Sequence, residues 1–417
     1  MESYLKITQA PYLLFHLAEA FRNLKLTKKE LEKAILKKVK RTVNFAYHNT
    51  SYYHNIMKKS RIRPSEIRCL NDMKKIPTLS RDELQKNYEN IIAKNIKCVY
   101  SHKTSGTLNP PIKIQYDKNY LIHDTCLLLR QLTIIGYTPR MKFAEFKEYQ
   151  LENSIIRRLL NYFGFFRKLE LPANSTPKEI IQKLKEFRPH FFITSLSMIL
   201  TLLGEIDESM PYLTLIIGGE TSTRKMREKI RDVVGFKNVL EWYNCWECGH
   251  IAYECECGNL HLNSDYNFVE LLDKNGEPLS EGERGEVVIT CLSNFRMPLI
   301  RYKLGDLAIY EGKCECGSNL PSIRDVIIRK NNVLKLNKKR LIFPEKILEL
   351  IADLPVKEWN KLQIIQERDS SIKIFGKDID ETFLLKLSNI INSQFKVVKK
   401  NKFKKKWIPV SSRMVSF

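Results

Sequence analysis

The 417-residue sequence contains no run of eighteen apolar residues. A helix needs about that length to cross a bilayer, so the sequence predicts no membrane span. The N-terminal segment also lacks a basic leader and a small-residue cleavage site, and His16, Glu19 and Arg22 interrupt its short apolar patch. We therefore expect a cytoplasmic protein.

Acidic residues are scarce relative to basic ones: 47 aspartates and glutamates stand against 70 lysines and arginines, which gives a net charge of +23. A basic balance attracts nucleic acid, anionic lipid or nucleotides. The excess is spread along the chain, with one dense run at 397–407. We interpret it mainly as a solvated surface and do not expect nucleic acid as a partner.

Disulfide bonds are not expected either, because a chain without an export signal stays in a reducing compartment. The ten cysteines would then bind a metal or remain free thiols. Their clustering calls for a local explanation. Six of them are Cys245, Cys248, Cys255, Cys257, Cys314 and Cys316.

The sequence CECG occurs twice within this cluster, at 255–258 and at 314–317. Two such knuckles brought together supply four thiolates, which form a closed tetrahedral zinc site. A closed site leaves no position open for a substrate, so we predict a structural role for the zinc. Free thiols are the alternative. The predicted ligands are Cys255, Cys257, Cys314 and Cys316, and His250 or His261 could replace one of them or lie in the outer shell.

Two helix starts can be recognised in the first hundred residues. Thr27 and Glu30 have capping-box spacing at the beginning of the segment 26–49, whose apolar residues recur with a helical period. Ser80 and Glu83 have the same spacing and indicate a second start.

Later segments predict the fold class. A helical pattern at 176–187 is followed by apolar strand candidates at 191–196 and 213–220, and this alternation indicates a layered α/β domain. Short strand patterns with an Asn-Gly turn fill 267–310, and the stretch 330–417 offers a hairpin and a helix.

We therefore predict an α/β protein of two domains. The larger comprises 1–328, with a β-rich part at 267–328, and the smaller is an α+β domain at 329–417. No internal repeat is detectable.

The stretch KTSGTLNPPIKIQ, at 103–115, places three hydroxyls around a glycine, followed by Lys113. A flexible backbone of this kind can turn its N–H groups toward an anion while the hydroxyls donate further hydrogen bonds. It is not a Walker loop, because the Gly-Lys-Ser/Thr ending is missing. An ordinary turn between strands is the alternative. The residues concerned are Thr104, Ser105, Gly106 and Thr107.

Further segments follow this loop in a definite order: LIIGGE ends at Glu220, EWYNCWECG begins at 241, MPLIRYKLGD ends at Asp306 and IIRKNN begins at 327. Together with the stretch 45–84, they make the chain resemble the adenylate-forming superfamily. The resemblance is to the phenylacetate-coenzyme A ligase branch and its capsule-biosynthesis relatives, and it extends over roughly residues 35 to 415.

The resemblance implies that the loop from Thr104 to Pro111 closes over the β- and γ-phosphates of ATP, with Thr104 taking part in catalysis. It also implies that Glu247 holds Mg²⁺, and a carboxylate is a suitable hard ligand for that ion. The superfamily brings one lysine of the small domain to the reacting carboxylate, and this lysine corresponds to Lys406. An ammonium group can bridge the carboxylate and the α-phosphate. The alternative for Lys406 is a solvated basic tail.

The same resemblance places the rest of the nucleotide. The turn at 218–220 flanks adenine, Tyr243 stacks on it and Asp306 accepts hydrogen bonds from the ribose hydroxyls. Arg329 matches the arginine of the interdomain hinge, about which the small domain is expected to move. The implied residues are Gly218, Gly219, Glu220, Tyr243, Asp306 and Arg329.

Some positions depart from the family pattern. Leu108 and Asn109 replace Thr-Gly and precede two prolines, which predicts a stiffer loop. Asn244 and Trp246 replace a glycine and a threonine, and 330–332 lacks two hinge carboxylates. A divergent enzyme and a decaying one both fit these changes.

The implied reaction is activation of a carboxylic acid by ATP and Mg²⁺, with release of pyrophosphate and transfer of the acyl group to coenzyme A or another nucleophile. The segment 189–200 is apolar and aromatic, which suits a hydrophobic acid but selects none. Two alternatives remain: an adenylyltransferase acting on a hydroxyl-bearing cofactor or a saccharide precursor, and a catalytically weak basic binding protein. The sequence does not define the oligomeric state.

Overall fold

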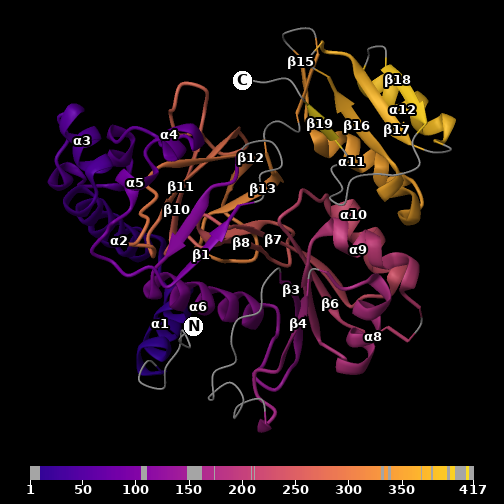
Figure 1. The fold of residues 1–417 in the computed structure, drawn as a ribbon, viewed down its shortest axis with the longest axis horizontal. Helices are drawn as coiled ribbons and strands as arrows, with labels where there is room; N and C mark the ends of the chain where they lie inside the picture. Colours follow the sequence, from indigo (N-terminus) through magenta and orange to yellow (C-terminus); the bar gives the residue numbers. More distant parts are fainter. Residues whose placement is uncertain are drawn as a thin grey trace. The chain divides into compact units, whose positions relative to one another are not determined.

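A computed structural model describes residues 10–104, 110–147, 162–172, 174–207, 209–210, 212–329, 333–336, 340–367, 369–376, 379–391, 395–399 and 410–412. The chain divides into two compact units. Unit 1 is formed by described residues up to 138 and from 242 to 326, and unit 2 by those from 139 to 241 and from 327 onward. Both units combine helices with β-sheets, which confirms the predicted α/β class (Figure 1).

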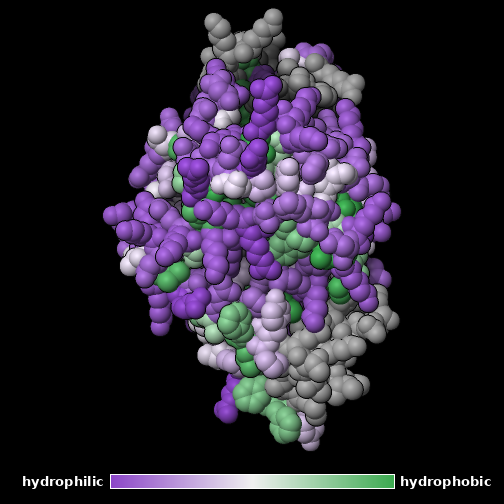
Figure 2. Space-filling view, turned by 90° about the vertical axis from the view of Figure 1, so that its left-hand side faces the viewer, coloured by the Kyte–Doolittle hydropathy of each residue, from purple (hydrophilic) through white to green (hydrophobic). Residues whose placement is uncertain are grey.

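Helices form the N-terminal part of unit 1. The predicted helix is α2 (Lys28–Asn49), and the Thr27 side chain caps it by accepting a hydrogen bond from the Glu30 backbone. The face of unit 1 that carries α2 and α3 is mainly hydrophilic (Figure 2). The other helices are α1 (Ala10–Asn23), α3 (Ser51–Lys59), α4 (Arg81–Lys86), α5 (Tyr88–Ile91) and α6 (Lys118–Ile134), with 3-10 turns at Pro64–Glu66 and Leu70–Lys75.

The second predicted helix start is also confirmed, because Ser80 and Glu83 form the capping box of α4. The Ser80 hydroxyl accepts a hydrogen bond from the Glu83 backbone at 3.2 Å. Among the described residues, none of the helices combines the length and the apolar character needed to cross a bilayer.

The sheet of unit 1 contains the predicted β-rich part. Its strand order is β10-β11-β12-β13-β9-β8-β7, and a separate antiparallel ladder is formed by β1 and β2. The strands are β1 (Tyr100–Lys103), β2 (Lys113–Tyr116), β7 (Asn238–Cys245), β8 (Gly249–Glu254), β9 (Leu260–Leu262), β10 (Asn267–Leu272), β11 (Arg284–Cys291), β12 (Tyr302–Gly312) and β13 (Ser322–Ile327).

A buried ion pair joins the helices of unit 1 to this sheet. Arg130 of α6 and Asp265, which lies between β9 and β10, are 2.8 Å apart, and both side chains are fully buried. Arg130 also donates to the Ala20 carbonyl oxygen of α1 at 3.1 Å, and Asn23 donates to Asp265 at 2.9 Å. Burial opposes ionisation of Asp265, but the charge of Arg130 outweighs it and lowers the pKa of that carboxyl group.

Replacing Arg130 with methionine should lower the free energy of unfolding by about 3–5 kcal/mol at pH 7, because an unpaired carboxylate would remain buried. Without Arg130, burial raises the pKa of Asp265 in the folded variant above the ordinary value of about 3.9. The loss should therefore shrink as the pH falls through that raised pKa toward about 3.9, because protonation removes the uncompensated charge, and it should be smaller at about pH 3.5 than at pH 7. Urea unfolding at pH 7 and at pH 3.5 tests this. The double variant Arg130→Met/Asp265→Leu is the control and should recover most of the stability. An equal loss at both pH values would contradict a charge-based explanation.

Unit 2 contains the predicted alternation of helices and strands. The predicted apolar segments at 191–196 and 213–220 contain β5 (Phe191–Thr194) and β6 (Thr214–Gly218), which pair in parallel. Their continuous apolar runs are typical of strands covered on both faces. The order is β6-β5-β3-β4, with β3 (Phe143–Lys147) and β4 (Lys168–Pro172) at one edge. The helices are α8 (Pro177–Phe187), α9 (Leu196–Leu202), α10 (Arg224–Val234) and the 3-10 turn Leu203–Glu205.

The C-terminal part of unit 2 contains the predicted hairpin and helix, as β16 (Gln363–Gln366), β17 (Ile372–Gly376) and α12 (Glu381–Ile391). These strands form a sheet of order β18-β17-β16-β19. Its buried side chains belong to the same hydrophobic cluster as those of β5, β6 and α10. Movement of 329–417 as a separate domain stays a prediction. The remaining elements are β14 (Leu334–Leu336), β15 (Arg340–Ile342), α11 (Pro344–Asp353), β18 (Phe395–Lys399), β19 (Val410–Ser412) and the 3-10 turn Val356–Lys361.

Candidate functional site

Tyr243 and Asp306 meet in the interior of unit 1. The Tyr243 hydroxyl donates a hydrogen bond of 2.6 Å to Asp306 Oδ2, and the two residues are 2% and 6% exposed. Burial raises the pKa of Tyr243 well above its usual value, and the Asp306 carboxylate adds to the effect. The phenol therefore stays protonated and acts as a donor that fixes the orientation of the carboxylate.

This contact depends on the curvature of the sheet. Tyr243 lies on β7 and Asp306 on β12, and three strands separate β7 from β12 in the strand order. In a flat sheet the two strands would be roughly 19 Å apart, beyond the reach of the two side chains. The strands must therefore curl toward each other.

Glu247 lies in the tight turn between β7 and β8 and is 9% exposed. Gly249 closes this turn with a φ of +72°, and a Cβ atom at this position would collide with the Asp124 carboxylate, so a glycine is required. The Trp246 ring stacks on His102 of β1, with ring centroids 3.5 Å apart. The Trp246 carbonyl oxygen also accepts a hydrogen bond from the Tyr116 hydroxyl of β2. The unusual Trp246 thus holds the turn against the β1–β2 ladder.

Thr104 begins the predicted phosphate loop. Its hydroxyl oxygen accepts hydrogen bonds from the Ile112 backbone at 3.0 Å and from Arg81 at 3.1 Å. The ladder of β1 and β2 brings the two ends of the loop together, with Lys103 paired to Lys113. Ser105, Gly106 and Thr107 lie outside the described residues.

The predicted adenine-flanking turn lies in unit 2, after β6. Gly218 ends that strand, and Gly219 has a φ of +76°, a backbone conformation that favours glycine. The Glu220 carboxylate accepts hydrogen bonds from the Ser197 backbone and hydroxyl, each at 2.7 Å, at the first turn of α9. A carboxylate is favourable at a helix N-terminus.

The predicted hinge begins beside this turn. The Ile328 backbone donates to the Thr221 hydroxyl at 2.9 Å, and Arg329 has a φ of +68°. The rest of the hinge, 330–332, lies outside the described residues, and so does Lys406. The role of each of these residues stays a prediction.

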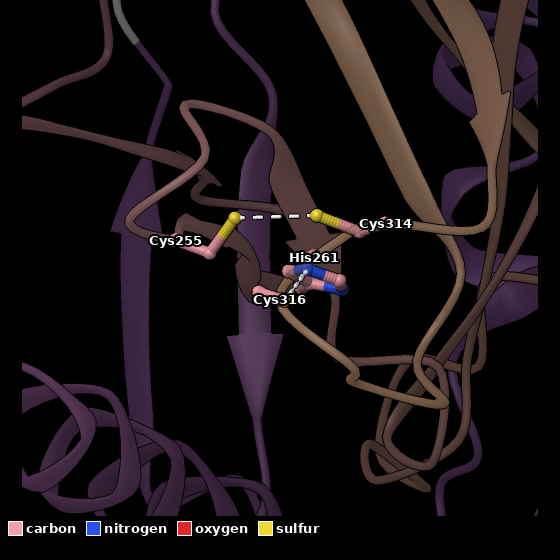
Figure 3. Close-up of side chains that lie close together, drawn as sticks. All are labelled: Cys255, His261, Cys314 and Cys316. Carbon is pink, nitrogen blue, oxygen red and sulfur yellow. Dashed lines mark hydrogen bonds between the residues drawn. The ribbon is translucent and has the colours of Figure 1, made fainter.

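A second site in unit 1 brings together Cys255, His261, Cys314 and Cys316 (Figure 3). One potential ligand atom of each lies within 4.8 Å of the others. The Sγ atoms of Cys255 and Cys314 are 3.6 Å apart, and His261 Nε2 is 3.1 Å from Cys316 Sγ. Cys255 follows β8, His261 lies on β9, and the other two occupy the turn between β12 and β13.

His261 joins this group because of the strand register. β9 pairs with β13 through His261 and Ser322, which places the histidine next to the β12–β13 turn. His261 Nδ1 is 3.0 Å from the Leu320 carbonyl oxygen, which can only accept, so Nδ1 carries the proton and Nε2 is left as a ligand.

The sequence named His261 as a possible substitute for one of four cysteines, and the structure places it in the group instead of Cys257. Cys257 lies near Cys314 but outside the set of four. His250 is outside it as well, with its Nε2 atom 3.9 Å from Asp124.

The thiols of this group have opposed ionisation tendencies. Burial disfavours ionisation of Cys314, yet hydrogen bonds from the Cys316 backbone and from the Asn259 side chain help to lower its pKa to about 6. Burial is the main cause that raises the pKa of Cys316 to about 12, and the neighbouring Cys314 and Cys255 add to the increase, because a second thiolate beside the first is unfavourable. A divalent cation would remove this conflict, since it stabilises neighbouring thiolates together.

Arg81 is the residue of this region that sequence reasoning missed. It is the first residue of α4, and its guanidinium group lies between Thr104 and Glu247. Nothing in the local sequence distinguishes it from an exposed basic residue in the first turn of a helix. Its position within the stretch 45–84, which the resemblance includes, is the one signal that could have indicated it.

Comparison with known proteins yields several relatives, although no family model matches the chain. Phenylacetate-coenzyme A ligase of Escherichia coli is 25% identical over 296 residues, which covers 67% of each chain. The enzyme of the same name from Thermus thermophilus is 24% identical over 336 residues, covering 76% of this chain and 74% of the relative. Protein CapK of Staphylococcus aureus is 21% identical over 319 residues, covering 72% and 68%.

Solved structures show the same fold. The crystal structure of 2-hydroxyisobutyryl-CoA ligase in the postadenylation state with R3-HIB-AMP matches with a TM-score of 0.78 and 15% identity, over 94% of this chain and 91% of that one. Anthranilate CoA ligase with anthranoyl-AMP matches with a TM-score of 0.54 and 14% identity, over 72% and 62%.

Proposed function

We propose that this chain, as a member of the adenylate-forming superfamily in the branch of the phenylacetate-coenzyme A ligases, activates a carboxylic acid as an acyl-adenylate. Transfer of the acyl group to coenzyme A completes the proposed reaction. The observation that carries the proposal is the contact between Tyr243 and Asp306. The two residues come from distant strands, and the resemblance assigned both to the same nucleotide.

In the proposed reaction an oxygen of the substrate carboxylate attacks the α-phosphorus of ATP, a new P–O bond forms, and pyrophosphate leaves. Asp306 would accept hydrogen bonds from the ribose hydroxyls, and Tyr243 would hold the Asp306 carboxylate in position. Lys406, as the resemblance implies, would neutralise charge on the reacting carboxylate and the α-phosphate.

Glu247 is suited to hold Mg²⁺ at the phosphates. It offers carboxylate oxygens, the preferred ligands of this ion, from a rigid turn. Its side chain is 12% exposed, so it is sheltered but accessible. A bound Mg²⁺ would supply electrostatic stabilisation of the phosphate charge.

Release of pyrophosphate in the presence of single acids tests the proposal. The purified chain, with ATP and Mg²⁺, should release pyrophosphate at least tenfold faster with one class of acid, among aryl, fatty and sugar acids, than without acid. Added coenzyme A should then yield the thioester of that acid. A stable product that carries AMP on a hydroxyl group would instead identify an adenylyltransferase. ATP binding without turnover in any of these mixtures would contradict the ligase assignment.

We propose separately that Cys255, His261, Cys314 and Cys316 hold a structural Zn²⁺. Three thiolates and one imidazole are a typical donor set for structural zinc, and four protein ligands leave no open position. The hydrogen bond from His261 to the Leu320 carbonyl supplies the outer-shell support usual for such ligands. The zinc would join the turn after β8 to the turn between β12 and β13, and β12 carries Asp306.

A further inference from the structure

We infer that Arg81 is a further substrate-contacting residue of the proposed nucleotide site and that it binds the β- and γ-phosphates of ATP. The inference deepens the proposed function and rests on it. Arg81 Nη2 donates hydrogen bonds of 3.1 Å both to the Thr104 hydroxyl and to the Pro110 carbonyl oxygen. These are the described residues on either side of the predicted phosphate loop. The guanidinium group therefore lies where the two ends of the loop converge.

The same group faces the proposed magnesium ligand. Arg81 Nη1 is 3.7 Å from Glu247 Oε1, and the two side chains are 25% and 12% exposed. Arg81 therefore neutralises the charge of Glu247 without forming a short hydrogen bond to it. When Mg²⁺ takes over that neutralisation, the guanidinium donors become available for an anion beside the ion.

Arg81 also retains unused hydrogen-bonding capacity. Its Nε atom is buried and has no hydrogen-bond partner among the residues that the structure describes. A buried donor without an acceptor is unfavourable, and such groups are rare in native proteins unless they serve a ligand. A guanidinium group that offers Nε together with a terminal nitrogen matches two phosphate oxygens in a bidentate arrangement.

The backbone of Arg81 is held rigidly, as a ligand-binding residue requires. The capping box of Ser80 and Glu83 fixes the start of α4. Two residues earlier, Leu79 forms backbone hydrogen bonds of 2.9 Å with Arg301 and with Lys303, at the beginning of the strand that carries Asp306. Hydrogen bonds between backbone groups thus connect the segment that carries Arg81 to the strand that carries Asp306, the proposed ribose ligand.

Comparing the affinities of Arg81 variants for ATP and for AMP distinguishes a phosphate contact of Arg81 from a structural role, because AMP lacks the β- and γ-phosphates. Arg81→Met should weaken ATP binding in the presence of Mg²⁺ by roughly 10- to 100-fold, as expected for the loss of charge-assisted hydrogen bonds, and should leave AMP binding within about threefold of wild type. Arg81→Lys should recover part of the loss, since it keeps the charge but not the fork of donors. Isothermal titration calorimetry with each nucleotide provides the measurement.

Gln85→Ala is the matched control. Gln85 donates to the same Pro110 carbonyl oxygen at 3.0 Å but carries no charge, so its loss should change ATP affinity less than about threefold. Equal weakening of ATP and AMP binding by Arg81→Met, or no weakening of either, would overturn the inference while leaving the proposed function intact. A wild-type chain that binds neither nucleotide would overturn the proposed function and the inference with it.

Discussion

Replacing Asp306 with alanine is expected to weaken ATP binding by more than about 100-fold, because each lost hydrogen bond between a ribose hydroxyl and a charged carboxylate contributes about 1.5–3 kcal/mol. The fold should persist. The variant leaves the buried Tyr243 hydroxyl without the carboxylate to which it donates, which should lower the free energy of unfolding by about 1–3 kcal/mol. Titration calorimetry with ATP and Mg²⁺ gives the affinity, and urea unfolding gives the stability.

Tyr243→Phe separates the two effects. This variant keeps the aromatic ring and the Asp306 carboxylate and removes the hydroxyl group alone. It should lose roughly tenfold or less in ATP affinity, because the carboxylate can still accept from ribose but is held less firmly. If Asp306→Ala bound ATP as tightly as wild type, Asp306 would not be the ribose ligand. That conclusion would hold even if the chain still activated an acid.

Replacing Cys314 and Cys316 together with serine should remove about one zinc ion per chain and lower the free energy of unfolding by several kcal/mol, because binding of a structural metal contributes directly to folding. Elemental analysis of the purified chain measures the metal, and thermal unfolding measures the stability. A chelator added to the wild-type chain should reproduce the destabilisation. The rate of pyrophosphate release should fall only in proportion to the fraction of the chain that is unfolded. A closed zinc site has no place for a substrate, so its loss should not affect the reaction directly.

Two cysteine variants serve as controls. Cys69→Ser removes an exposed thiol outside the group and should leave the zinc content unchanged, and the serine hydroxyl can replace the thiol that donates to Asp72. Cys257→Ser tests the ligand set itself, since the structure places His261 in the group and Cys257 beside it. If Cys257→Ser retained zinc and His261→Ala lost it, the result would support a zinc site with three thiolate ligands and one imidazole ligand. A wild-type chain without zinc would end the proposal.

Local patterns predicted the elements of this fold well. The helix at 26–49, with Thr27 and Glu30 as its capping box, follows from interactions between residues three or four positions apart, which the sequence states directly. The strands β5 and β6 follow from continuous apolar runs. The β-rich part follows from alternation and turn residues. Each of these signals depends on near neighbours alone.

The candidate sites were only partly predictable. The ordered set of segments, through the resemblance, indicated Tyr243, Glu247 and Asp306. No local signal indicated Arg81, because its partners Thr104 and Pro110 come from another segment of the chain. In the metal group, the repeated CECG favoured four thiolates. The pairing of His261 with Ser322 was not visible in the sequence, and that register decides which side chains converge.

The sequence by itself determined which residues were available for chemistry and in which elements they lie, because composition, periodicity and capping act over a few residues. Only the tertiary structure decided which of them meet. The curling of the unit 1 sheet brings the Tyr243 hydroxyl to the Asp306 carboxylate, and the packing of α4 against β12 places Arg81 where it can donate to Thr104. Such contacts arise from the burial of apolar surface and the closure of distant backbone ladders, and both depend on the whole chain.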